Sequence, residues 1–140
     1  MNDNNYDLPL QLQVTASALS DFDNQILHNS LSIGIAQYKV LITLEGKALL
    51  TQKHIALRLD QTEASISRQV AVMYEDGLIK TQVKKGDRRV HYVILTPRGK
   101  RYLKRAQKIL AEHHAQTFAS FSKKKQEQLR NTLLEIQNCL

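Results

Sequence analysis

Residues 51–99 decide the fold, and they read TQKHIALRLDQTEASISRQVAVMYEDGLIKTQVKKGDRRVHYVILTPRG. Thr51 can cap a short helix whose apolar positions recur at helical spacing up to Leu59. Residues 60–62 break this pattern, and Thr62 can cap a second helix. The stretch then changes to two β-rich runs, which favour a hairpin. It therefore predicts a helix, a turn, a second helix and a hairpin.

The second helix is predicted to bury Ile66, Val70 and Met73 on one face. On a wheel of 100° per residue, the outward residues are Ala64, Ser65 and Arg68, with Ser67 on the flank. A helix that reads DNA must enter a groove only about 12 Å wide, so a small polar face with one long cation suits that task. The alternative is an ordinary surface helix.

The hairpin is predicted to pair residues 78–83 with residues 90–95 and to enclose a tip at residues 84–89. Four of these six tip residues are cations, namely Lys84, Lys85, Arg88 and Arg89. Such charges repel one another and gain nothing from a core, but beside a helix-turn-helix they can reach phosphates or the minor groove. We call this hairpin the wing; the alternative for its tip is a solvated turn.

Further helices are predicted on both sides of this segment. The ranges are 12–26, 35–44 with Gly46 as terminator, 97–118 with Thr96 as cap and Pro97 at its first position, and a last helix after a break at Ser122. Residues 48–50 are long enough only for a bridge or a tiny strand. Five cations crowd the first turns of the 97–118 helix, where the helix dipole favours acids, so either they are simply exposed or an anion lies nearby.

The fold class predicted is mainly α with a small antiparallel hairpin, a winged helix-turn-helix with dimerisation helices at both ends. The expected divisions of one structural domain are residues 1–34 for an acidic tail and first dimerisation helix, 35–98 for the DNA-binding lobe and 99–140 for the remaining dimerisation helices. The terminal helices carry apolar stripes that the lobe does not need. They could pack on each other within one chain, but we favour a two-fold homodimer.

Charge is unevenly distributed in this chain of 140 residues with net charge +7. Residues 47–105 carry a net charge of +9, whereas residues 1–46 carry −4, so the middle of the chain can attract a polyanion. No apolar run is long enough to cross a bilayer, and the acidic start lacks the basic region of a signal peptide. The single Cys139 fits a reducing compartment. We therefore expect a cytoplasmic protein with no membrane partner.

These motifs, in this order, resemble the MarR family of bacterial transcriptional regulators. The resemblance rests on Ile55-Ala56 and Leu59, then Ala64-Ser65-Ile66-Ser67-Arg68, Asp76-Gly77-Leu78-Ile79, Gly86-Asp87-Arg88-Arg89 and Leu95-Thr96-Pro97-Arg98-Gly99. It implies a homodimer that binds pseudo-palindromic double-stranded DNA, with a small-molecule pocket between the dimerisation helices and each lobe. It also implies a bacterial protein that is nucleoid-associated when bound. We expect a regulator that represses and is relieved by an effector.

The expected DNA-binding residues are Thr62, Ser65, Ser67, Arg68, Lys84, Lys85, Arg88 and Arg89. Asp87 is expected to hold the Arg89 guanidinium in one orientation, which reduces the rotamer entropy lost on binding; the alternative is a plain turn-forming aspartate. His91 stands where the family commonly has Lys or Arg, which weakens a phosphate contact there. The effector pocket is expected at Phe22, Ile26, Tyr38 and Leu41, although ordinary core residues are the stronger interpretation.

Other functions have less support from the sequence. The sequence contains no phosphate-binding loop, no zinc-protease motif and no nucleophile to which a general base can be assigned. We therefore expect no catalysis and no cofactor. Glu112-His113-His114 lacks a metal ligand one helical turn further on, so a metal-responsive member of the family is a minor alternative and no metal site is assigned. A thiol-based peroxide sensor is less favoured still, because members of the family of that type carry the reactive Cys near the N-terminal helix, and the single Cys here is Cys139. The alternative of another class is a winged helix that binds an acidic protein.

Overall fold

A computed structural model describes residues 7–46 and 48–140, so the predicted acidic tail at residues 1–6 lies outside the described residues. The elements are α1 (Leu8–Leu31), α2 (Ile35–Thr43), α3 (Gln52–Leu59), α4 (Glu63–Glu75), β1 (Ile79–Lys84), β2 (Asp87–Leu95), α5 (Pro97–Thr117) and α6 (Lys123–Cys139). Their order matches the prediction, and the predicted fold class, a winged helix-turn-helix with extra helices, is confirmed.

Helix ends differ from the prediction where capping decides them. Helix α1 is longer than expected at both ends, because Asp7 accepts a hydrogen bond from the backbone N–H of Leu10 and Ser32 ends the helix in the left-handed conformation. Helix α2 ends earlier, with Leu44 as a right-handed C-cap, so Gly46 does not act as a left-handed terminator. Ser122 lies at the predicted break between the last two helices, and its side chain also caps α6.

The strands of the wing pair antiparallel, and the turn between them is shorter than predicted. Strand β2 begins at Asp87, so only residues 85–86 form the turn, and Gly86 supplies the positive φ of 88° that it requires. Consecutive residues Val83 and Lys84 pair with His91 and Asp87, so residues 88–90 form a bulge in β2. The predicted six-residue tip is therefore wrong in extent, and its two arginines lie in the bulge.

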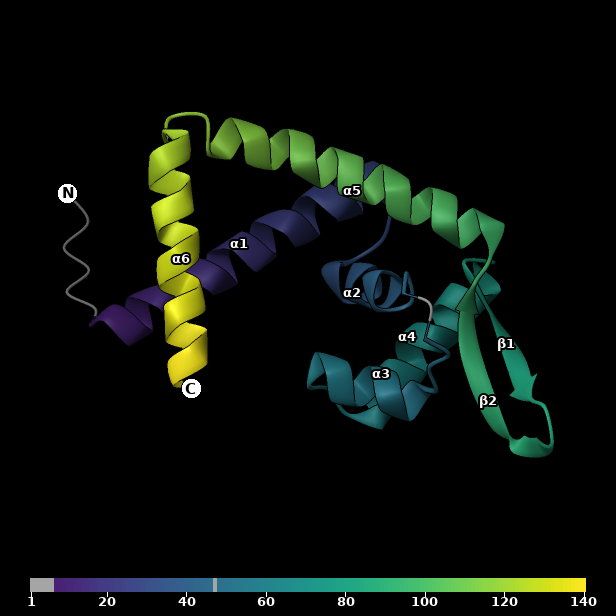
Figure 1. The fold of residues 1–140 in the computed structure, drawn as a ribbon. Coiled ribbons are helices and arrows are strands. Elements are labelled where there is room, and N and C mark those ends of the chain that lie inside the picture. Colours follow the sequence, from purple (N-terminus) through teal and green to yellow (C-terminus); the bar gives the residue numbers. More distant parts are fainter. Residues whose placement is uncertain (1–6, 47) are drawn as a thin grey trace.

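One hydrophobic core joins the lobe to α1 and α5. Its fully buried side chains come from several elements, including Leu27 of α1, Leu41 of α2 and Ile66 of α4. The predicted bridge is confirmed, because Leu50 pairs with Val93 of β2. Figure 1 shows α5 running along the upper side of the molecule, and α1 rising from the lower left to meet it. Elements α2, α3, α4 and the wing are grouped below the N-terminal half of α5.

Helix α6 stands apart from this core (Figure 1). Every residue of α6 is exposed or only half-buried, and Leu129 and Leu134 each expose 51% of their surface. The N-terminal half of α1 is equally exposed, with Leu8 at 74%. Across the described residues, none of the helices combines the length and the apolar character needed to cross a membrane.

Candidate DNA-binding surface

Capping residues define the helix-turn-helix. Asp60 ends α3 with a φ of 51°, a conformation that Asp tolerates better than most residues. Thr62 then caps α4, because its Oγ1 accepts a hydrogen bond from the backbone N–H of Ser65 at 3.1 Å. The turn between the two helices is therefore held by local contacts, as the sequence predicts.

The outward face of α4 differs slightly from the helical wheel. Ser67 and Arg68 are exposed, whereas Ser65 is half-buried and its Oγ donates to Gln61 Oε1 at 3.4 Å. The two serines lie 100° from Ile66 on a wheel, on opposite sides, and the side chain of Ser65 contacts Gln61 in the turn that precedes α4. Ser67, placed on the flank by the sequence, is thus the more accessible of the two serines.

The wing presents its cations to solvent. Lys84, Lys85 and Arg88 are exposed, and the Arg89 side chain retains 92% of its surface. Asp87 Oδ1 accepts hydrogen bonds from both the backbone N–H of Arg89 at 3.0 Å and its Nε at 3.3 Å. One carboxylate oxygen thus forms the local turn and also contacts the guanidinium, a geometry compatible with both interpretations of Asp87.

A groove joins α4 to the wing. It consists of two adjoining hollows of about 290 and 360 Å³ that share Gln52 and Thr81 as lining residues. The first also borders Lys53, Arg89 and His91, and the second borders Ser67. We call this surface the lobe groove.

Sequence reasoning missed Gln52, Lys53 and Thr81, because only the fold brings the first turn of α3 beside β1 and β2. A local signal for two of them did exist. Gln52 and Lys53 directly follow the cap Thr51, so they occupy the first turn of a helix, where side chains commonly meet phosphates.

The four residues expected in an effector pocket lie mostly in the core. Leu41 is fully buried and Ile26 is 8% exposed, which agrees with their interpretation as core residues. The Phe22 ring meets the His113 ring edge-on with centroids 6.5 Å apart. Tyr38 is half-buried, and burial, followed by the charges of Asp23 and Glu45, raises the pKa of its hydroxyl above the usual value.

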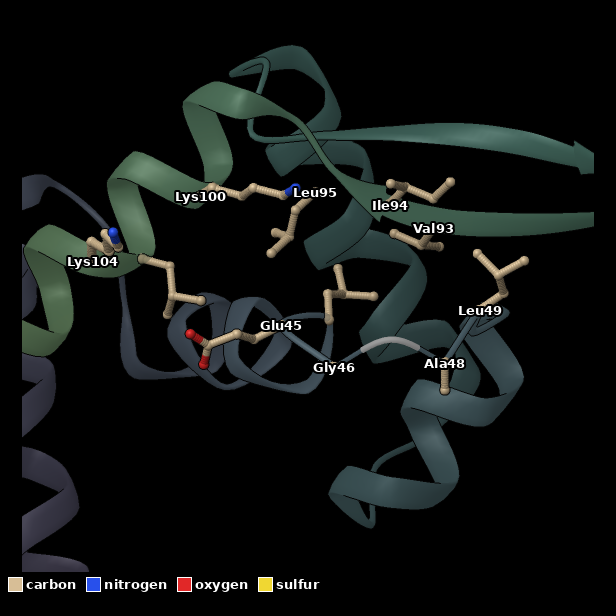
Figure 2. Close-up of a pocket in the computed structure, with 11 residues that line it drawn as sticks. Glu45, Gly46, Ala48, Leu49, Val93, Ile94, Leu95, Lys100 and Lys104 are labelled. Carbon is tan, nitrogen blue, oxygen red and sulfur yellow. The ribbon is translucent and has the colours of Figure 1, made fainter.

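A cavity of about 420 Å³ lies instead between the end of α2, β2 and the start of α5. Figure 2 shows Val93 and Leu95 on its wall, with Lys100 and Lys104 of α5 on one side and Glu45 on the other. The Glu45 carboxylate accepts a hydrogen bond from Gln107 Nε2 at 3.1 Å. Among the described residues, the cavity lining therefore combines apolar walls with two cations and one engaged anion.

The histidines of α5 have protein partners. His114 Nε2 lies 2.6 Å from Asp23 Oδ1 on α1, and His113 Nδ1 lies 2.9 Å from the Ile109 carbonyl oxygen. Among residues 7–46 and 48–140, no three His, Cys, Asp or Glu side chains gather as metal ligands. Cys139 is exposed at the end of α6.

Comparison with known proteins supports the predicted resemblance. Residues 31–90 match the model of the MarR family. The apo structure of wild-type MarR from E. coli has a TM-score of 0.83 at 18% identity, covering 94% of this chain and 97% of that chain. No curated protein matches this chain.

Two further solved structures are similar over nearly their whole length. A MarR/EmrR family transcriptional regulator from Acinetobacter sp. ADP1 has a TM-score of 0.77 at 21% identity, covering 93% of this chain and 92% of that one. CouR from Rhodococcus jostii RHA1, solved bound to p-coumaroyl-CoA, has a TM-score of 0.77 at 21% identity, covering 97% and 95%. The resemblance to the MarR family is thereby confirmed, in sequence over residues 31–90 and in fold over most of the chain.

Proposed function

We propose that this chain, which has the winged-helix fold of MarR family transcriptional regulators, binds a pseudo-palindromic operator in double-stranded DNA as a homodimer and represses transcription from it. Arg68 and Ser67 of α4 read base edges in the major groove, with Thr62 and Ser65 at the start of the same helix. Arg89, oriented by Asp87, enters the minor groove, and Lys84, Lys85 and Arg88 contact phosphates.

The observation that carries this proposal is the lobe groove. Ser67 of the recognition helix and Arg89 of the wing border adjoining hollows that share Gln52 and Thr81. One concave surface therefore brings Ser67 of α4 together with exposed cations of α3 and the wing, with Glu75 at the other end of its α4 side. Contact with both a groove and its flanking phosphates requires such a combination of polar and cationic side chains. Lys53 adds a further cation to this surface, and we assign it a phosphate contact.

The salt dependence of DNA binding tests this proposal against a winged helix that binds an acidic protein. If about three to five cations per subunit contact phosphates, a dimer neutralises about six to ten, and log affinity falls against log salt with a slope of roughly −5 to −9. The operator is first selected from fragments of the source genome. A slope near zero, or no binding to any duplex in dilute buffer, would favour the protein-binding module.

Lys53→Ala gives a sharper check on the groove. Because the residue is exposed at the start of α3, the variant should fold normally. A dimer loses two such contacts, so the salt slope should fall by about two units on every sequence alike. Lys124→Ala is the matched control, since Lys124 is exposed on α6 and lies outside the groove. An unchanged slope in Lys53→Ala would remove this residue from the interface.

The homodimer is supported by the apolar surface that one chain leaves uncovered. Leu129 and Leu134 of α6 and Leu8 of α1 are all at least half exposed. Phe118, Leu129, Leu133 and Leu134 also line a hollow of about 400 Å³ between α5 and α6. Apolar surface of this kind on two terminal helices suits a two-fold interface with a second copy.

We assign the effector to the cavity in Figure 2 rather than to Phe22, Ile26, Tyr38 and Leu41. The cavity lies between the lobe and α5, and its apolar walls with Lys100 and Lys104 suit a small apolar carboxylate. A ligand that prefers one arrangement of lobe and α5 lowers DNA affinity by that difference in preference.

Benzoate, the simplest aromatic carboxylate, serves as the probe. Benzoate should weaken operator binding by the original chain. It should have no such effect on a double variant that carries both Lys100→Gln and Lys104→Gln. The matched control is Lys108→Gln, which removes a cation further along α5, outside the cavity. Equal effects of benzoate on all three proteins would count against this cavity as the effector site.

A further inference from the structure

The C-terminal ends of two helices each accept a hydrogen bond from a side chain of α5. Carbonyl groups in the last turn of a helix lack an intrahelical donor and carry the negative end of the helix dipole. Arg98 Nε donates to the carbonyl oxygen of Asp76, the C-cap of α4, at 3.0 Å. Tyr102 Oη donates to the carbonyl oxygen of Leu31, the last residue of α1, at 2.5 Å. Helix α5 thus contacts the ends of both the recognition helix and α1.

These two side chains also contact each other. Arg98 and Tyr102 are four residues apart, so they lie on the same face of α5. The guanidinium carbon of Arg98 is 5.9 Å from the centre of the Tyr102 ring, within the range of a cation–π interaction. A continuous row of contacts therefore runs from Asp76 through Arg98 and Tyr102 to Leu31. We call this row the α4–α1 link.

The position of Arg98 also accounts for one cation in an unfavourable place. In the first turn of α5 its charge opposes the dipole of its own helix. The carbonyl end of α4 supplies the compensating negative charge, through the hydrogen bond to Asp76. Arg98 is exposed, which is one of the two options raised from the sequence, and its hydrogen bond to Asp76 makes the other option, a bound anion, unnecessary.

Close contacts of Thr96 and Gly99 hold α5 against the same segment. Thr96 Oγ1 donates to the carbonyl oxygen of Gly77 at 2.6 Å, and the Thr96 N–H donates to the carbonyl oxygen of Leu78 at 3.1 Å. Gly99 lies so close to Leu78 that a Cβ there would be 2.0 Å from the Leu78 carbonyl oxygen. The first turn of α5 is therefore seated directly on the segment that follows α4.

We propose that Arg98 and Tyr102 are positioning residues that set the angle of α4 relative to α1 and α5, and hence the half-site spacing that a dimer accepts. The inference rests on the proposed homodimer, whose two recognition helices must meet major grooves about 34 Å apart. Directional hydrogen bonds resist rotation at this joint in a way that apolar packing alone does not. Removing either side chain of the α4–α1 link should therefore change the preference for half-site spacing far more than the affinity for a single half-site.

The DNA experiment uses the selected operator, duplexes with one base pair added or removed between its half-sites, and a duplex with a single half-site. Arg98→Ala and Tyr102→Phe should leave single half-site affinity within about twofold and reduce the discrimination between spacings by about 2- to 30-fold. Arg101→Ala, which removes an exposed cation from the same helix, is the control and should discriminate like the original chain. Discrimination unchanged in both variants, or an equal loss of affinity on all duplexes, would overturn the proposal.

A second measurement needs no DNA. Spin labels are placed by Ala71→Cys on α4 and Glu112→Cys on α5 in a chain carrying Cys139→Ser, and labelled protein is diluted with unlabelled chain. The distance distribution should broaden in Arg98→Ala and Tyr102→Phe and stay narrow in Arg101→Ala. An unchanged distribution overturns the α4–α1 link whatever the DNA result. A broadened one in a protein that binds no duplex would support the link and reject the proposed function.

Discussion

Arg68 and Arg88 illustrate how position gives two similar side chains different tasks. Both are exposed cations, but Arg68 projects from the recognition helix and Arg88 from the bulge of the wing. A side chain that reads base edges contributes to the choice of sequence, whereas one that meets phosphates contributes equally to every sequence.

Arg68→Ala is expected to cost about 1–3 kcal/mol of operator affinity and to relax sequence preference. Arg88→Ala should weaken binding to all sequences alike and reduce the salt slope. Titration of the operator and of a scrambled duplex at several salt concentrations measures both effects. The reverse pattern would exchange the two assignments.

Asp87→Ala removes a negative charge from the wing, yet it should impair recognition. Without the contacts from Asp87 Oδ1, Arg89 loses its preferred orientation and pays more rotamer entropy on binding. The ratio of operator to scrambled-duplex affinity should fall about two- to tenfold, while affinity for scrambled DNA stays equal or rises. In an Arg89→Ala background the same change should leave the ratio unaltered, and a further fall there would show that Asp87 acts by another route.

At the scale of elements, close contacts between helices decide which changes are tolerated. Gly99 touches the backbone of Leu78, whereas Gly46, in the connection after α2, has open space around the position of a Cβ. The two glycines therefore form a matched pair for testing the joint between α5 and the lobe.

Gly99→Ala should destabilise the fold by about 1–3 kcal/mol, because the new methyl group forces α5 away from Leu78. Gly46→Ala should change the free energy of unfolding by less than about 0.5 kcal/mol. Urea unfolding of the two variants and the original chain provides the comparison. Equal stabilities would mean that α5 sits more loosely on the lobe than these contacts indicate.

Tyr38 couples α1 and α2 to pH. Its pKa is raised in the folded chain by burial and by the charges of Asp23 and Glu45, so the folded state holds the phenolic proton more tightly than the unfolded state. The contribution is fully present below the unfolded pKa of about 10 and is lost as pH rises further. Above pH 10 the free energy of unfolding should decline more steeply in the original chain than in Tyr38→Phe, as followed by urea titrations at pH 9 to 11. Parallel declines would contradict this.

At the scale of the whole molecule, exposed apolar residues indicate what one chain lacks. Leu129 is half exposed on α6 and would be covered by a second copy. Leu129→Asp should therefore shift a dimer towards monomer at micromolar concentration, because a charge would be buried without a partner. Asn131→Asp adds the same charge about 200° around the helix and should remain dimeric. Sedimentation equilibrium distinguishes the two, and a monomeric original chain would reject the homodimer.

The sequence by itself determined the elements whose cause is local. Thr51, Thr62 and Thr96 cap helices as their positions predict, and the apolar spacing of Ile66, Val70 and Met73 identifies the buried face of α4. Side-chain caps act over three residues, and helical periodicity extends over one or two turns. Because both signals are local along the chain, the sequence by itself is enough to recognise them.

Only the tertiary structure decided which of these pieces meet. The lobe groove, the cavity between α2, β2 and α5, and the α4–α1 link each join residues far apart in the chain, as the contact of Tyr102 with Leu31 shows. The burial of Ser65 and the bulge that holds Arg88 and Arg89 likewise depend on packing and strand register. Such contacts depend on how helices and strands lie in three dimensions, and the spacing of residues along one chain carries no measure of that.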